Sequence, residues 1–202
     1  MFCDAKTHYD LLIDEGDDPV FDAPSLRAYM DGWDGAFFVE RVIQEKPQTV
    51  LEIGVGTGRL ALRIAPVCAR FYGVDISPKT VVRAKDNLRA IQSVTLLCAD
   101  FLEWETEEKF DAVYSSLTFF HIQDKERAVR KVANLLRLGG RFVLSIDKAH
   151  GDILELSSRK VRLYPDTPTQ MQAYLQNAGL TVLEKTETER AHIFVSEKQR
   201  DL

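Results

Sequence analysis

The sequence predicts an α/β protein whose doubly wound, mostly parallel sheet carries helices on both faces. Short, continuously apolar runs recur along the chain, and helical patterns alternate with them. Runs that are apolar on both sides are typical of parallel strands covered on both faces. The predicted strands begin at Thr49 and continue with residues 70–76, 93–100, 110–117 and 141–147.

Apolar residues at helical spacing predict the helices between these strands. They cover residues 35–46, a segment after residue 60, a segment that begins at Ser77-Pro78, about 124–138, and 167–178. Ser77 can cap its helix and Pro78 fits the first turn. Gly139 and Gly140 are expected to end the helix that begins near residue 124.

The two ends of the chain follow different patterns. Residues 1–34 are rich in Asp, Gly and aromatic residues, with Pro19 and Pro24 as breakers, so we expect irregular structure there. Near the other end, LTVLEKTET and RAHIFVSEK are too close for a parallel crossover and predict an antiparallel hairpin at the sheet edge. Residues 148–166 are expected to form an insertion over the site, with a short strand at KVRLY.

Composition and charge limit the classes of function. The 202 residues carry a formal net charge of −5, which lacks the electrostatic attraction for nucleic acid, so we expect no nucleic-acid partner. Three widely spaced cysteines indicate neither a disulfide framework nor a metal site. The acidic N-terminus does not resemble a signal peptide, and no apolar run reaches the roughly 18 residues of a membrane span. We therefore expect a cytoplasmic protein without a bound metal.

The most informative pattern is VLEIGVGTGRLA at residues 50–61, where a predicted strand leads through three glycines into a helix. Glycines permit a tight turn and let a ligand approach the backbone. In open α/β sheets, ligands bind beyond the carboxyl ends of the strands. A dinucleotide loop reads G-x-G-x-x-G, but Arg59 occupies the position of its third glycine. Glu52, before the loop, favours a ligand with cationic groups over a diphosphate.

Two further acids end the next two predicted strands. Asp75 can accept hydrogen bonds from both hydroxyls of a ribose, and Asp100 can accept one from an adenine amino group, with Phe101 beside the ring. Each has a structural alternative, since aspartate also caps helices and commonly ends strands. The glycine loop alone is weak evidence, but the loop together with both acids indicates a nucleoside site more strongly.

With these residues the sequence resembles the class I S-adenosylmethionine-dependent methyltransferases, especially the small-molecule branch, over roughly residues 48–147. The resemblance implies that the methionine part of the cofactor is held by Glu52, Gly54, Gly56 and Gly58. It implies ribose binding by Asp75 and adenine binding by Asp100, and we place Ile76, Phe101 and Ser115 in the same cofactor site. It also implies a seven-stranded sheet of order 3-2-1-4-5-7-6 with the last strand antiparallel.

We expect a single domain over residues 1–202 on this basis. Residues 1–47 would form an N-terminal lid or helical segment, and residues 48–147 the cofactor-binding core. Residues 148–202 would hold a variable segment, a helix and the C-terminal β-hairpin.

His121 lies just beyond the fourth predicted strand and is a candidate general base, because histidine titrates near neutral pH. The alternative is a packing or hydrogen-bonding histidine, which is the more common role for such a loop residue. Ser115 and Ser116 end the same strand, and we expect at least one of them to approach the cofactor.

Aromatic residues of the N-terminal segment are candidates for a lid over the substrate, namely Tyr9, Tyr29 and Trp33. Aromatic faces suit a sulfonium cation, although ordinary packing onto the sheet is the alternative. Arg159, Lys160 and Arg162 form a small basic cluster that either attracts an anionic substrate or is a solvated edge.

The predicted function is methyl transfer from S-adenosylmethionine to a small-molecule acceptor. No N/D-P-P-Y/F/W sequence follows FDAVYSS, which together with the acidic charge disfavours methylation of nucleic-acid bases. The alternatives are an aminopropyl transferase on the same fold, a dehydrogenase, and a non-catalytic module that binds S-adenosylmethionine for regulation or for a partner.

Overall fold

A central seven-stranded sheet organises the computed structural model, which describes residues 1–148 and 151–199. The strand order is β4-β3-β2-β5-β6-β10-β9. In that order the strands span Val94–Cys98, Arg70–Asp75, Thr49–Ile53, Phe110–Ser115, Leu136–Asp147, Ala191–Lys198 and Leu180–Glu187. The first five pair in parallel, and β10 pairs antiparallel with both β6 and β9. The expected fold class and strand order are confirmed.

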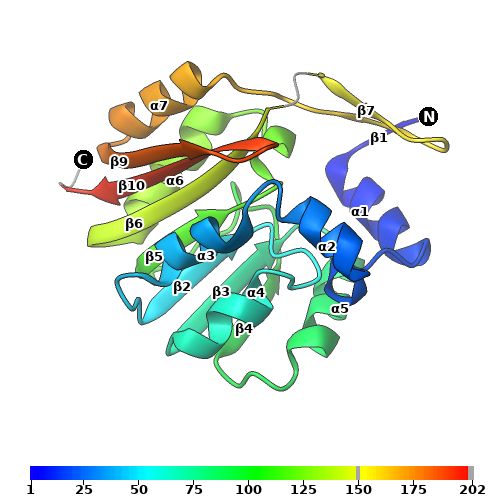
Figure 1. Cartoon of the computed structure of the whole chain (residues 1–202), viewed down its shortest axis with the longest axis horizontal. Coiled ribbons are helices and arrows are strands. Elements are labelled where there is room, and N and C mark those ends of the chain that lie inside the picture. The colour runs from blue at the N-terminus through cyan, green and yellow to red at the C-terminus, as the bar shows by residue number, and fades with distance from the viewer. Residues whose placement is uncertain (149–150, 200–202) are drawn as a thin grey trace.

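Helices cover both faces of this sheet (Figure 1). On one face lie α3 (Gly35–Ile43), α4 (Ala61–Ile64) and α5 (Pro78–Leu88). They contribute the buried side chains of Phe38, Ile64 and Leu88, respectively, to one core cluster. On the other face, α6 (Lys125–Leu135) and α7 (Pro168–Asn177) contribute Val129 and Leu175 to a second cluster. None of the helices in the described ranges combines the length and the apolar character of a membrane span.

The expectation of irregular structure over residues 1–34 was wrong. The segment contains the helices α1 (Ala5–Asp14) and α2 (Pro24–Met30) and the 3-10 turn η1 (Pro19–Phe21). The Asp4 carboxylate caps α1 by accepting a hydrogen bond from Thr7 N at 2.7 Å. Pro19 and Pro24 lie in the first turns of η1 and α2, where the missing N–H has no helical partner to lose. They therefore start these elements instead of breaking them.

The helix expected over residues 124–138 ends earlier, so the assignment of Gly139 and Gly140 as its end was wrong. Helix α6 ends at Leu135, and β6 begins at the next residue. Leu136 pairs with Phe110, and the register between β5 and β6 then shifts before Ala112. The glycines accordingly lie in an irregular stretch of strand, where Gly139 adopts a φ of +75°.

A small second sheet joins the N-terminus to the segment after β6. Its order is β1-β8-β7, formed by Phe2–Cys3, Lys160–Arg162 and Ile153–Glu155. The strand expected at KVRLY is confirmed as β8, whereas β1 was too short to be recognised. Residues 149–150, within the predicted insertion, lie outside the described residues. Figure 1 shows α1 and this sheet together at one side of the molecule.

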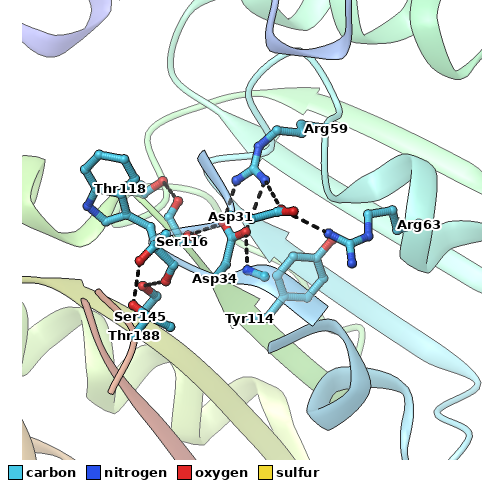
Figure 2. Close-up of polar contacts among 12 residues, drawn as sticks. Asp31, Asp34, Arg59, Arg63, Tyr114, Ser116, Thr118, Ser145 and Thr188 are labelled. Atoms are coloured by element: carbon cyan, nitrogen blue, oxygen red, sulfur yellow. Dashed lines mark hydrogen bonds and ion pairs between the residues drawn. The ribbon is translucent and has the colours of Figure 1, made fainter. Parts of the chain in front are cut away.

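The N-terminal segment is fixed to the sheet through the buried carboxylate of Asp34, which precedes α3 (Figure 2). Arg59 Nη2 donates to Asp34 Oδ2 at 2.5 Å and Nη1 donates to Oδ1 at 3.1 Å. Ser116 Oγ donates to the same carboxylate at 2.8 Å. The Asp34 side chain is 0% exposed and that of Arg59 is 17% exposed. One carboxylate therefore connects the N-terminal segment, the glycine loop and the loop after β5.

Further polar contacts surround this carboxylate (Figure 2). Arg59 and Arg63 also lie 3.8 and 3.5 Å from Asp31. Ser145 Oγ donates to Trp33 O at 2.6 Å, and Thr188 Oγ1 donates to the carbonyl of Gly32 at 2.6 Å. The chain between α2 and α3 is thus anchored to β6 and to the turn before β10.

Replacing Asp34 by alanine is expected to lower the free energy of unfolding by about 3–5 kcal/mol, because it leaves the largely buried Arg59 guanidinium without its partner. Arg63→Ala removes a more exposed ion pair and is expected to cost at most about 1 kcal/mol. Urea unfolding of both variants measures the difference. Equal losses would contradict the structural role of Asp34.

Candidate functional site

A cavity of about 1070 Å³ opens at the carboxyl ends of β2, β3 and β4. Its wall is formed by these strand ends, the glycine loop, α1, and the loop that follows β5. Ligand pockets typically measure about 300–1,000 Å³, so this one has room for a nucleoside and a small second molecule. It lies where ligands bind in open α/β sheets.

Glu52 lies at the wall of this cavity, on β2, and its side chain is buried with 3% exposure. Tyr114 OH donates a hydrogen bond to Glu52 Oε2 at 2.8 Å. Burial raises the pKa of the Glu52 carboxyl well above its usual value, while the Tyr114 hydrogen bond and the charge of Arg59 act in the opposite direction. A carboxylate that loses hydration in this way gains most from a cationic group beside it. The residue therefore fits a ligand that carries an ammonium group.

The glycine loop places its backbone against the cavity. Gly54 and Gly56 line the wall with φ values of +76° and +56°, whereas Gly58 does not line it. A Cβ added at Gly54 would lie 1.9 Å from Thr118 Oγ1, so only glycine fits there. Gly58 lies against Leu88 of α5 and has a packing role in the loop. Of the three glycines predicted to hold the cofactor, two line the cavity.

Asp75, at the end of β3, is half-buried in the cavity wall. Its two carboxylate oxygens accept hydrogen bonds from Gly56 N and Ser77 N, each at 3.0 Å. Burial raises the pKa of the Asp75 carboxyl, and these backbone hydrogen bonds only partly oppose the rise. The hydrogen bonds fix the orientation of the carboxylate next to the glycine loop.

The third acid, Asp100, lines the same cavity but is exposed. Its Oδ1 accepts a hydrogen bond from Leu102 N at 2.8 Å. Phe101 is buried and Ile76 half-buried, and both also line the wall. The structure thus brings together the acids predicted from three strand ends and the two apolar residues predicted beside them.

Ser115 lies outside the cavity, contrary to its predicted place in the cofactor site. Its hydroxyl is buried and donates to Ile53 O at 2.9 Å. The next residues, Ser116, Leu117 and Thr118, line the cavity instead. Side chains alternate along a strand, so a shift of one residue at its end exchanges the buried and the open face. Leu117 has a φ of +56°, an uncommon conformation for a branched residue.

His121 ends the 3-10 turn η3 (Phe119–His121) and lines the cavity together with Tyr9 of α1. The Tyr9 hydroxyl and His121 Nε2 are 3.0 Å apart. His121 Nδ1 is buried and has no hydrogen-bond partner among the described residues. Burial, followed by the charges of His8 and Lys125, lowers the pKa of His121 to about 4. Its imidazole is therefore neutral at physiological pH.

Tyr29 and Trp33, the other two predicted lid residues, do not line the cavity. Their rings are 5.1 Å apart, and the Arg190 guanidinium stacks over both at 4.1 and 5.1 Å. They pack against the turn between β9 and β10, and the neighbouring Met30 reaches the cavity instead. Of the three aromatic residues, only Tyr9 is at the site.

Several lining residues were not predicted from the sequence, among them His8, Met30, Thr118 and Tyr164. They come from segments whose fold the sequence left open, so no spacing pattern identified them. Arg159, from the basic cluster, has a side chain that is 3% exposed and bonds to Glu15 at 2.5 and 2.9 Å. Within residues 1–148 and 151–199, no group of three or more His, Cys, Asp or Glu side chains is placed to hold a metal.

The pH dependence of stability tests the environment of Glu52. In the unfolded chain this carboxyl titrates near its ordinary value of 4.5, and in the folded protein well above it. The folded state then binds more protons between these two values, so stability falls as the pH rises through that window. We expect Glu52→Gln to reduce the loss of unfolding free energy as the pH rises above 4.5, measured by urea unfolding without ligand.

Glu105→Gln is the matched control, because the Glu105 side chain is 92% exposed. It is expected to leave the pH dependence unchanged. An identical pH dependence for Glu52→Gln and the unaltered protein would show that Glu52 titrates normally in the folded state.

Comparison with known proteins identifies the core. Residues 51–144 match the family model described as a methyltransferase domain. An uncharacterized methyltransferase of Anoxybacillus flavithermus is 35% identical over 121 residues, which cover 58% of this chain and 56% of that protein. The chain thus spans little more than half the length of this curated relative.

Solved structures share the fold. N-methyltransferase NodS from Bradyrhizobium japonicum WM9, in complex with S-adenosyl-L-homocysteine, has a TM-score of 0.73 and 17% identity, covering 96% of this chain and 100% of that one. The [4+2]-cyclase SpnF has a TM-score of 0.75 and 17% identity, covering 97% and 96%. These likenesses establish the fold, and the family match assigns the core. Residues 51–144 are therefore identified as a methyltransferase core, and the chain has the fold of the class I S-adenosylmethionine-dependent methyltransferases.

Proposed function

We propose that this protein transfers a methyl group from S-adenosylmethionine to a small-molecule acceptor. The observation that carries the proposal is the meeting of Glu52, Asp75 and Asp100 around one cavity beside the glycine loop. S-adenosylmethionine, when bound, supplies a methyl group activated by a sulfonium centre. The protein's part is then mainly to bind and align, an effect that lowers barriers by about 7–11 kcal/mol.

Each acid has a separate task in this proposal. Glu52 holds the ammonium group of the methionine part. The positive charge of this group favours the ionised form of the Glu52 carboxyl, which burial disfavours. Asp75 accepts hydrogen bonds from the ribose hydroxyls while Gly56 N and Ser77 N keep it oriented. Asp100 accepts a hydrogen bond from the adenine amino group, and Ile76 and Phe101 flank the base.

We assign the whole chain to one catalytic domain. Residues 1–30 and 151–166 roof the cavity formed by the core, because β1 pairs with β8 and because Tyr9 and Tyr164 line the wall. Exclusion of water by such a roof strengthens electrostatic interactions at the site. His121 lines the cavity as a neutral imidazole, but its pKa of about 4 makes it a weak general base, so the proposed rate enhancement depends mainly on alignment.

Asp75→Ala is expected to weaken binding of S-adenosylhomocysteine roughly 10- to 150-fold, since hydrogen bonds to charged groups contribute about 1.5–3 kcal/mol. Calorimetric titration measures the change. Asp86→Ala on the exposed side of α5 is the control and should bind as tightly as the unaltered protein. Unchanged affinity of Asp75→Ala would contradict the ribose assignment.

Turnover tests the proposed reaction. A fold of this kind does not fix the chemistry, as the neighbour named as a [4+2]-cyclase illustrates. With methyl-labelled S-adenosylmethionine and a collection of small-molecule acceptors, we expect labelled product and S-adenosylhomocysteine in equal amounts. Tight binding of the cofactor without turnover on any acceptor would favour the alternative, a non-catalytic regulatory or partner module.

A further inference from the structure

The basic cluster at residues 159–162 contains a guanidinium that the proposed function does not use. The Arg159 side chain is only 3% exposed and does not line the cavity. Its Nη1 and Nη2 donate to the two carboxylate oxygens of Glu15 at 2.5 and 2.9 Å, so its charge is balanced. Arg159 therefore attracts no anionic ligand directly, but a further hydrogen bond connects it to the cavity wall.

This hydrogen bond is made to His8, a buried residue of α1 that lines the cavity. Arg159 Nε donates to His8 Nδ1 at 2.9 Å. Because a guanidinium has no acceptor atom, His8 Nδ1 is the acceptor and carries no hydrogen. Burial, followed by the charge of Arg159, lowers the pKa of His8, so its imidazole is neutral at physiological pH. The hydrogen of the neutral ring is then on Nε2, which makes His8 Nε2–H a donor.

The Nε2–H group of His8 is available to a ligand. Within residues 1–148 and 151–199, Nε2 has no hydrogen-bond partner. Unlike His121 Nδ1, which is also unpartnered, it is not completely enclosed by protein atoms. His8 is 3% exposed as a residue and forms part of the cavity wall, so this small accessible area opens into the cavity.

His8 lies apart from the residues assigned to the cofactor. It comes from α1 in the roof, whereas the three acids of the cofactor assignment lie at the ends of strands. Its ring centroid is 4.9 Å from that of Tyr9 and 6.5 Å from that of His121, which follows β5. The donor is therefore on the part of the wall that the cofactor assignment leaves for a second molecule.

We propose that His8 determines the specificity for the methyl acceptor, because its Nε2–H donates a hydrogen bond to an oxygen of that molecule. This assignment rests on the proposed function. Arg159 is the positioning residue, since its hydrogen bond to Nδ1 orients the ring and keeps the hydrogen on Nε2. The donor fits a carbonyl, ether or phenolic oxygen. An ammonium group at this point is excluded, because two donors would face each other.

Two probes of the same shape isolate this hydrogen bond. Acetophenone has a carbonyl oxygen where α-methylstyrene has a methylene group. The histidine nitrogen NMR spectrum of the unaltered protein, saturated with S-adenosylhomocysteine, is recorded with each probe, and the His8 signals are assigned by their loss in His8→Phe. We expect an unprotonated Nδ1 and a protonated Nε2 for His8. Acetophenone should shift the Nε2 resonance, and α-methylstyrene should not.

His8→Phe keeps a ring and removes the donor. The affinity for acetophenone relative to that for α-methylstyrene, measured by NMR titration, is expected to fall roughly two- to tenfold, the effect of one neutral hydrogen bond. Comparing this ratio between proteins cancels the different hydration of the two probes. His192→Phe is the matched control and should keep the ratio, because His192 lies on β10 beside Glu187 and away from the cavity.

Arg159→Leu tests the positioning role, because it leaves the His8 ring in place and removes the group that orients it. The ratio should fall in this variant as well. A purely structural role for Arg159 would weaken the binding of both probes equally and leave the ratio unchanged. Lys160→Leu is the matched control from the same basic cluster, since Lys160 pairs with the exposed Glu155 at 2.7 Å, and it should keep the ratio.

The possible results separate this assignment from the proposed function. A protonated Nδ1, or an equal ratio in His8→Phe and the unaltered protein, would overturn the role of His8. Weaker binding of S-adenosylhomocysteine to His8→Phe would place the donor at the cofactor and contradict the acceptor assignment. Absence of binding of both probes to the loaded protein would refute the subsite and leave the cofactor site intact. Failure of S-adenosylhomocysteine to bind the unaltered protein would refute the proposed function, and the subsite with it.

Discussion

The parallel pairing of β2, β3 and β4 is the constraint on which the site depends. Because neighbouring parallel strands end at one edge, Glu52, Asp75 and the loop that begins with Asp100 meet there although they are far apart in sequence. Hydrophobic helices on both faces bury the strands and remove water from the first two acids. The same burial that stabilises the sheet therefore raises the pKa of both carboxyls. At Glu52 it favours a ligand with positive charge beside the carboxylate.

A second layer of structure converts this edge into an enclosed cavity. The buried Asp34 carboxylate holds Arg59 of the glycine loop and Ser116 of the loop after β5, so the floor of the cavity is continuous with the N-terminal segment. The pairing of β1 with β8 then joins α1 to residues 151–166 over the cavity. Arg59 occupies the position of the third glycine of a dinucleotide loop, and its guanidinium pairs with the Asp34 carboxylate instead of a diphosphate.

The sequence predicted most of the sheet and the glycines and strand-end acids that line the cavity, because both depend on local patterns. Apolar runs, glycines and strand-ending acids are visible without knowledge of distant contacts. The roof could not be predicted in the same way. Strand β1 has two residues and exists through its pairing with β8, and His8 reaches the cavity because Arg159, 151 residues further along the chain, bonds to it. Ser115 was misplaced because the strand pattern does not reveal on which residue the open face begins.

The most direct test of the central claim is a pair of calorimetric titrations of the purified protein, one with S-adenosylhomocysteine and one with NAD. The three acids and the interrupted glycine pattern predict micromolar binding of the sulfur nucleoside and no binding of the dinucleotide. Binding of NAD in preference to S-adenosylhomocysteine would contradict the claim, because it would mean that the loop accommodates a diphosphate despite the carboxylate of Glu52 and the side chain of Arg59.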